Sequence, residues 1–254
     1  MSNIYVHIGC EKTSSTTVQA CFERFGNEIF RGSLSFPSEL FQRPNQMELS
    51  SLVLPSKSLK NMMVPKSRSD FKESLVEYLR RNSDNNIYLT SEHLSSRVVE
   101  IDRIVELLSI LTVAGHRPVI LAFYREPFQW IFSHYKQYVS CGGFLSFEDY
   151  ISQSNDQGFI ANTTNYGKAL CHWAEVASEF NGYVRYRSYE ASASDLLNNF
   201  FIIADLSPVP GMEEIASNPS MTDSQVIVQR WVNLILRKRR MTDFLKRVIT
   251  NMPL

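Results

Sequence analysis

Short β-prone runs recur along the chain, separated by segments with a helical periodicity. The runs cover residues 4–8, 87–89, 118–124 and 182–186, and the third of them, PVILAFY, is apolar throughout. A continuous apolar run of this length is typical of a strand that is buried on both faces. The pattern therefore predicts four strands.

Between these runs, apolar residues recur every three or four positions, which predicts helices. The first helix follows a polar segment and carries Val18, Cys21, Phe22 and Phe25 on one face. Further helices are expected over about residues 70–81, 100–114, 127–140, 166–180 and 223–240, with two more after the capping candidates Ser146 and Ser194. We expect Ser69 or Asp70 to cap the helix over 70–81.

Residues 31–68 break this alternation. Four prolines fall in the segment, and because proline interrupts helices, we expect it to be irregular. Elsewhere strands and helices alternate, which predicts an α/β fold with a central, mainly parallel β-sheet flanked by helices. The length fits one large domain, so we expect a single domain over residues 1–254.

Polar clusters follow three of the predicted strands. They are residues 9–17, residues 90–93 and Arg125. Ligands of parallel α/β sheets bind beyond the carboxyl ends of the strands. We therefore expect Lys12, Glu92 and Arg125 to gather at one edge of the sheet.

The cluster after the first strand reads GCEKTSSTT and opens a helix. Orphan N–H groups and the helix dipole attract anions to such an end, and Lys12 adds a full positive charge. Neither GxxxxGK[ST] nor GxGxxG is present. The residues alone leave two interpretations open: an anion site, or a turn that only caps the helix. The hydroxyl side chains concerned belong to Thr13, Ser14, Ser15, Thr16 and Thr17.

The balance of basic and acidic residues argues against some classes of function. The chain has 26 basic and 26 acidic residues, which argues against a protein that coats nucleic acid or an anionic membrane but leaves room for one local anion site. No apolar stretch reaches the roughly 18 residues of a spanning helix. The four cysteines are widely spaced without a CxxC pair, so we expect no zinc site. Because the first residues also lack the pattern of a signal peptide, we expect a cytoplasmic protein with reduced thiols.

Two segments resemble motifs of the sulfotransferases that use 3′-phosphoadenosine 5′-phosphosulfate (PAPS). HIGCEKTSSTTVQ is similar to their 5′-phosphosulfate loop, usually K-T-G-T-T before a helix. LAFYREPFQWIFSHY is similar to their 3′-phosphate motif, with Arg125 after a buried strand and Ser133 eight residues later. TSEH at residues 90–93 resembles the S-S-E-H-L segment of bacterial, carbohydrate-type members, and weaker similarity extends over most of the chain.

This resemblance implies a P-loop-like sulfotransferase fold and transfer of a sulfuryl group from PAPS by in-line displacement. The product of the donor would be adenosine 3′,5′-bisphosphate, and no metal is required. The acceptor would be a hydroxyl on a glycan, a glycolipid or a small molecule, with a carbohydrate or glycoconjugate favoured. No nucleic-acid partner and no transmembrane segment are expected, and the sequence carries no signal for the oligomeric state.

The resemblance also assigns roles at the donor. Lys12 would stabilise the leaving phosphate, and residues 13–17 would bind the 5′-phosphate. Arg125 and Ser133 would bind the 3′-phosphate, a task that suits the planar fork of an arginine. Ser14 departs from the family pattern, because a Cβ replaces the usual glycine where the backbone approaches the phosphate.

Glu92 is favoured as the general base, because it matches the glutamate position of the resembling members. A carboxylate with a pKa near ~4.3 is a weak base for an alcohol. His93 is the rival, since imidazole is the more usual base near neutral pH.

Two other classes compete with this interpretation. A P-loop-type nucleotide kinase would use ATP and magnesium, but the GK[ST] pair and an acidic metal-binding strand are missing from the sequence. A non-catalytic nucleotide-binding module of the same fold is the other class, and Ser14 is the feature that supports it. If the chain is an enzyme, we expect residues 31–68 and 140–165 to shape its acceptor pocket.

Overall fold

The structure is a computed structural model that describes residues 1–9, 15–30, 34–41, 46–54, 67–95, 99–156, 158, 160, 164–188, 193–212 and 221–250. Its contacts divide the chain into two compact units. Unit 1 comprises residues 1–126 and 165–218, and unit 2 comprises residues 127–164 and 219–254. That the whole chain forms one domain stays a prediction.

Unit 1 is built on a five-stranded sheet with the strand order β2-β3-β1-β4-β5. Every neighbouring pair of strands is parallel, which confirms the predicted α/β class. In the centre of the sheet, His7 lies opposite Thr90 on one side and Leu121 on the other. The strands are β1 (Asn3–His7), β2 (Leu34–Ser35), β3 (Asn86–Thr90), β4 (Arg117–Tyr124) and β5 (Tyr183–Ser188).

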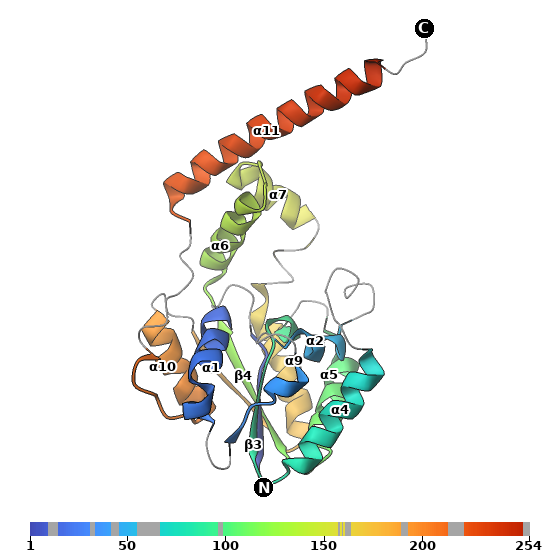
Figure 1. Ribbon diagram of the computed structural model, residues 1–254, viewed down its shortest axis with the longest axis vertical. Coiled ribbons are helices and arrows are strands. Elements are labelled where there is room, and N and C mark those ends of the chain that lie inside the picture. The colour runs from blue at the N-terminus through green and yellow to red at the C-terminus, as the bar shows by residue number, and fades with distance from the viewer. Residues whose placement is uncertain are drawn as a thin grey trace. The chain divides into compact units, whose positions relative to one another are not determined.

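Helices cover both faces of this sheet, with α1 and α10 on one face and α4, α5 and α9 on the other (Figure 1). Most were predicted within a few residues. The α-helices of unit 1 are α1 (Ser15–Ile29), α2 (Met47–Ser51), α4 (Arg68–Arg81), α5 (Ile101–Leu111), α9 (Tyr166–Glu179) and α10 (Ala193–Ala204), and its 3-10 helices are η1 (Ser38–Leu40) and η2 (Glu92–Ser95).

Three local predictions were wrong. The helix α4 is capped by Ser67, whose Oγ accepts a hydrogen bond from the Asp70 N–H at 3.2 Å, and Ser69 lies within the helix. The helix α10 begins at Ala193, so Ser194 lies inside the helix and not at the predicted position before it. The segment 31–68 is not irregular throughout, since β2, η1 and α2 form within it.

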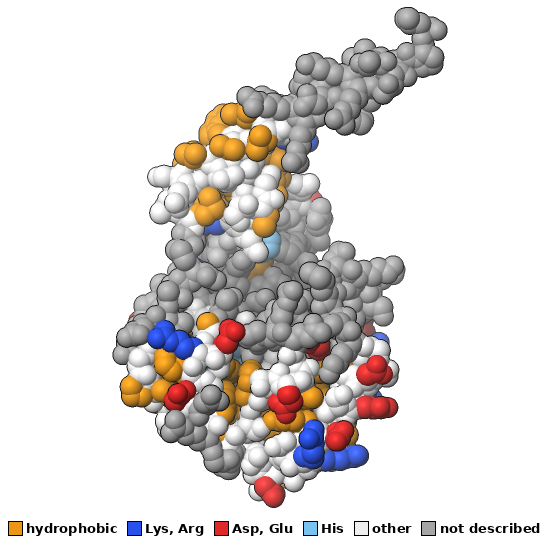
Figure 2. Space-filling model, in the orientation of Figure 1, with side chains coloured by type: hydrophobic (Ala, Val, Ile, Leu, Met, Phe, Trp, Pro, Cys, Tyr) orange, Lys and Arg blue, Asp and Glu red, His pale blue; other side chains and the backbone are white. Residues whose placement is uncertain are grey.

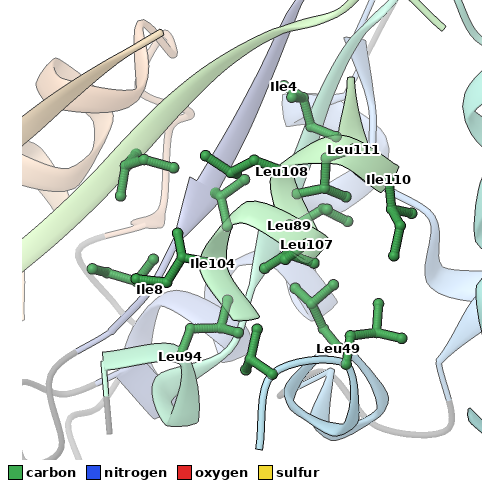
Figure 3. Packing of buried hydrophobic residues seen from close by; sticks show 14 of the residues in the cluster. Ile4, Ile8, Leu49, Leu89, Leu94, Ile104, Leu107, Leu108, Ile110 and Leu111 are labelled. Atoms are coloured by element: carbon green, nitrogen blue, oxygen red, sulfur yellow. The ribbon is translucent and has the colours of Figure 1, made fainter. Parts of the chain in front are cut away.

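The alternation of side chains along β1 explains why the sheet has two different cores. Ile4, Val6 and Ile8 face one side, and Tyr5 faces the other. The first side contributes to an aliphatic cluster, made mainly of leucine, isoleucine and valine (Figure 3), which includes Ile4, Val6, Leu49, Leu89, Leu94, Ile104 and Leu108. The second contributes to an aromatic cluster, which includes Tyr5, Phe22, Tyr88, Phe123, Phe200 and Phe201.

The described part of unit 2 includes the helices α6 (Pro127–Ser140), α7 (Phe147–Asp156) and α11 (Asp223–Thr250). Ser146 Oγ accepts a hydrogen bond from the Asp149 N–H at 3.1 Å, which confirms the predicted cap of α7. The Asn233 side-chain amide ties α11 to the end of α6, because it donates to the carbonyls of Val139 and Gly143, each at 2.8 Å. The helix α11 runs ten residues past its predicted end at residue 240.

The described surface carries both signs of charge, as equal numbers of basic and acidic residues lead one to expect. Figure 2 shows lysine and arginine interspersed with aspartate and glutamate on the visible face of unit 1. None of the described helices combines the length and the apolarity that crossing a membrane requires.

Candidate functional site

Segments with candidate chemistry leave from the carboxyl ends of three neighbouring parallel strands, β3, β1 and β4. Backbone hydrogen bonds continue past the strands. The Ile8 N–H donates to the Leu121 carbonyl at 3.0 Å, and the Ser95 N–H donates to the Ile8 carbonyl at 3.1 Å. The Ser95 hydroxyl also donates to the carbonyl of Gly9. The segments after β1 and β3 therefore start in direct contact with each other.

The predicted phosphate loop lies between β1 and α1. Gly9 has a φ of +56°, in the left-handed region that glycine adopts without strain, so the chain turns sharply as it leaves the strand. Lys12, Thr13 and Ser14 lie outside the described residues. The helix α1 begins at Ser15, and because it follows β1 directly, its N-terminus lies at the carboxyl edge of the sheet, where its N–H groups favour an anion.

Of the remaining hydroxyl residues in this segment, Ser15, Thr16 and Thr17, the structure describes the side chain of Thr17. Ser15 and Thr16 form the first turn of α1, and their side chains lie outside the described part. The Thr17 side chain is buried, with 4% of its surface exposed. The binding of a phosphate by residues 13–17 stays a prediction.

A buried polar network lies directly beneath this edge. One ring nitrogen of His7, Nδ1, is hydrogen-bonded to Thr90 Oγ1 at 2.9 Å. Gln46 Oε1 accepts a hydrogen bond from the Thr90 N–H at 2.8 Å. The hydroxyls of Ser50 and Ser91 are 2.6 Å apart. Thr90 and Ser91 thus make internal hydrogen bonds that fix the end of β3.

His7 is a packed residue of β1. Its ring meets Phe123 and Phe200 edge to face, with centroid distances of 6.1 and 5.3 Å. Burial lowers the pKa of His7 to about 4, and its Nε2 is buried without a hydrogen-bond partner. The imidazole is therefore neutral near pH 7.

The two candidates for the general base, Glu92 and His93, form the first half of η2, directly after the end of β3. The helix η2 is anchored at its far end, because Leu94 is buried in the aliphatic cluster and Ser95 contacts the segment after β1. The side chains of Glu92 and His93 lie outside the described part, so the choice between them stays open.

Arg125 directly follows β4 and is half-buried at the same edge of unit 1. Ser133 lies on α6, in unit 2, and is also half-buried. Their joint binding of one phosphate stays a prediction. Among the described residues, no group of His, Cys, Asp and Glu side chains has the arrangement of a metal site.

Comparisons with known proteins identify the fold. A scan of protein-family models and a search of curated proteins both find no match. Among solved structures, a sulfotransferase from Alicyclobacillus acidocaldarius matches with a TM-score of 0.53 and 14% sequence identity, over 89% of this chain and 88% of that chain. The chain has a sulfotransferase-like fold. A structure from the PezAT toxin–antitoxin system of Streptococcus pneumoniae matches over 92% of this chain and 86% of that chain, at 14% sequence identity. Its TM-score of 0.35 is too low to indicate a shared fold.

The sequence did not single out two residues of this sulfotransferase-like fold, Gln46 and Ser50. Both are completely buried and contact the end of β3, although they lie in the segment that was expected to be irregular. No motif or periodicity marks them, because their partners Thr90 and Ser91 are more than forty residues away. This part of the segment 31–68 belongs to the core, as the buried side chains of Leu49, Leu52, Val53 and Leu54 also show.

Proposed function

We propose that the protein is a sulfotransferase, which transfers a sulfuryl group from PAPS to a hydroxyl of a carbohydrate or glycoconjugate. One observation carries the proposal. In a chain with a sulfotransferase-like fold, the segments that resemble the two donor-binding motifs follow the neighbouring strands β1 and β4. A third segment, similar to the S-S-E-H-L sequence of bacterial members, follows β3 on the other side of β1.

The donor carries phosphates at two ends, and the chain offers a cation for each. Lys12, with the hydroxyls and N–H groups of residues 13–17, would bind the 5′-phosphate at the N-terminus of α1. Arg125 would bind the 3′-phosphate through its planar fork of donors, with Ser133 as a second donor. Two local charges and a helix end suffice for an anionic donor, so a chain with no net charge fits this function.

At the acceptor, Glu92 would accept the proton of the attacking hydroxyl, with His93 as the alternative base. The hydroxyl oxygen forms a bond to sulfur while the bond from sulfur to the bridging phosphate oxygen breaks. Lys12 would stabilise the negative charge that develops on that oxygen, which leaves with adenosine 3′,5′-bisphosphate. Positioning and electrostatics supply most of the catalysis in such transfers.

Calorimetry with adenosine 3′,5′-bisphosphate tests the donor site. Because a hydrogen-bonded charge contributes about 1.5–3 kcal/mol, Arg125→Ala should weaken binding about 10- to 100-fold. Arg117→Ala is the matched control, since Arg117 lies at the opposite end of the same strand, where its Nε donates to the Asn181 carbonyl. Binding that is absent from the folded wild type, or equally affected by both variants, would contradict the proposed donor site.

Incubation with labelled PAPS and a panel of glycans, glycolipids and small alcohols tests the transfer. We expect a labelled carbohydrate product with the wild type and almost none with Lys12→Ala, while the melting temperature stays unchanged. Tight binding of the bisphosphate without transfer to any acceptor would instead indicate a non-catalytic nucleotide-binding module.

A further inference from the structure

The outer side of β3 loses its strand partner before the strand ends. Among the described residues, the edge strand β2 pairs with β3 only at Leu34 with Asn86 and at Ser35 with Ile87. Along a parallel strand, successive N–H groups point to opposite neighbours. The Ser91 N–H is directed to β1, where it donates to the His7 carbonyl at 2.9 Å, so the Thr90 N–H points to the outer side, beyond the end of β2.

The side chain of Gln46 takes the place of the missing strand. Its Oε1 accepts the hydrogen bond of the Thr90 N–H at 2.8 Å, and the residue is completely buried. Gln46 has φ 45° and ψ 49°, a left-handed conformation that is uncommon for a residue with a Cβ. Strained backbone of this kind persists where the surrounding structure requires a particular geometry.

The amide nitrogen of Gln46 shows that packing alone does not account for a glutamine at this position. Its Nε2 is buried without a hydrogen-bond partner, which is unfavourable. An apolar side chain of similar length would avoid this cost but would leave the Thr90 N–H without an acceptor. The amide oxygen is therefore the part of Gln46 that the site uses.

The helix that follows Gln46 supports the same segment. Ser50, one turn into α2, has its hydroxyl 2.6 Å from that of Ser91. The helix α2 also packs against η2, and Leu49 and Leu94 lie at the same end of the aliphatic cluster (Figure 3). Residues on both sides of Glu92 thus contact α2.

We propose that Gln46 is a positioning residue for the general base of the reaction. It fixes the backbone at Thr90, two residues before Glu92 and three before His93, and so holds the base against the acceptor. This inference rests on the proposed function, because it assumes that the base lies in η2. A misplacement of about 1 Å can lower a catalytic rate by about 100-fold, so a single hydrogen bond at this junction can control turnover.

The test compares two substitutions of the same buried side chain. Gln46→Met keeps the length and removes the acceptor, and it should lower kcat about 10- to 100-fold while the KM for PAPS changes less than about twofold. Gln46→Glu keeps an oxygen acceptor for the Thr90 N–H and should retain kcat within about tenfold of the wild type. Val176→Ala, on α9, is the control for lost stability and should leave kcat unchanged, because α9 packs mainly against α5, β4 and β5.

Hydrogen exchange on the protein without ligand gives a second readout. In Gln46→Met, the amides of residues 90–95 should exchange faster, while those of β1 and β4 keep their wild-type rates. Unchanged exchange at Thr90 would overturn the positioning role whether or not the protein is active. Faster exchange with an unchanged kcat, or an equal loss of kcat in Val176→Ala, would overturn its link to the base. A wild type that binds no bisphosphate and transfers no label would instead overturn the proposed function, and with it the catalytic part of this inference.

Discussion

The two faces of the sheet differ in the kind of side chain that covers them, and each face supports a different half of the candidate site. The aliphatic cluster seats α4, α5 and α9 and, at the carboxyl edge, also η2 with the candidate base. The aromatic cluster seats α10 and α1, the helix that begins the candidate phosphate site. The candidate segments for phosphate binding and for the base, α1 and η2, therefore pack on separate cores that share one sheet.

A few large rings determine the geometry of the aromatic face. Phe200 contacts His7, Phe22 and Phe123, at centroid distances of 5.3, 5.5 and 6.2 Å. Such rings have preferred relative orientations, whereas aliphatic side chains pack without directional preference. We therefore expect the position of α1 to depend on single rings and the position of η2 to depend on hydrogen bonds as well as packing.

The largest expected effect comes from removing one ring. Phe200→Ala should lower the free energy of unfolding by about 3–5 kcal/mol, and Leu108→Ala in the aliphatic cluster by about 2–5 kcal/mol. Because Phe200 contacts Phe22 of α1, only Phe200→Ala should also weaken binding of the bisphosphate by the protein that remains folded. Urea unfolding and calorimetry measure the two effects, and equal loss of affinity in both variants would contradict the separation of the faces.

The second prediction uses the buried histidine of the aromatic face. Burial lowers the pKa of His7 from 6.5 to about 4, so the unfolded chain binds this proton at a higher pH than the folded chain. The contribution of His7 to stability is fully present above pH 6.5 and is lost as the pH falls towards 4, by about 3 kcal/mol in total.

Urea unfolding at pH 7, 5.5 and 4 checks this prediction. His7→Gln keeps a hydrogen-bonding side chain that does not titrate, so its stability should fall less over this range than that of the wild type. The difference between the two proteins separates the effect of His7 from that of carboxylates such as Glu106. Desolvation raises the pKa of Glu106, but its hydrogen bond to Arg103 and the nearby charge of Arg68 lower the pKa overall. Parallel curves for the two proteins would show that His7 does not titrate in this way.

Sequence patterns predicted the elements whose information is local. The run PVILAFY predicted β4, because burial on both faces leaves a continuous apolar run. The apolar residues at helical spacing predicted α1, because burial on one face leaves a periodic signal. The strand β2 was missed because two residues are too short for any period. The order of the motifs along the chain was enough to predict that the candidate segments lie at one edge of the sheet. The hydrogen bond from the Thr90 N–H to Gln46 was not predictable, because it joins residues 44 positions apart and needs a left-handed backbone that no local pattern encodes.

The smallest expected effect concerns α4, a helix of the aliphatic face with its own N-terminal cap. Ser67 Oγ accepts a hydrogen bond from the Asp70 N–H, so Ser67→Ala should lower the free energy of unfolding by about 1 kcal/mol. Ser69→Ala is the matched control: its hydroxyl is exposed and caps no N–H group, so the change should be within about 0.5 kcal/mol. Urea unfolding of both variants decides between the observed cap and the one that the sequence predicted, because a larger loss in Ser69→Ala would favour Ser69. Bisphosphate affinity should be unchanged in both, since α4 and α1 pack on opposite faces of the sheet.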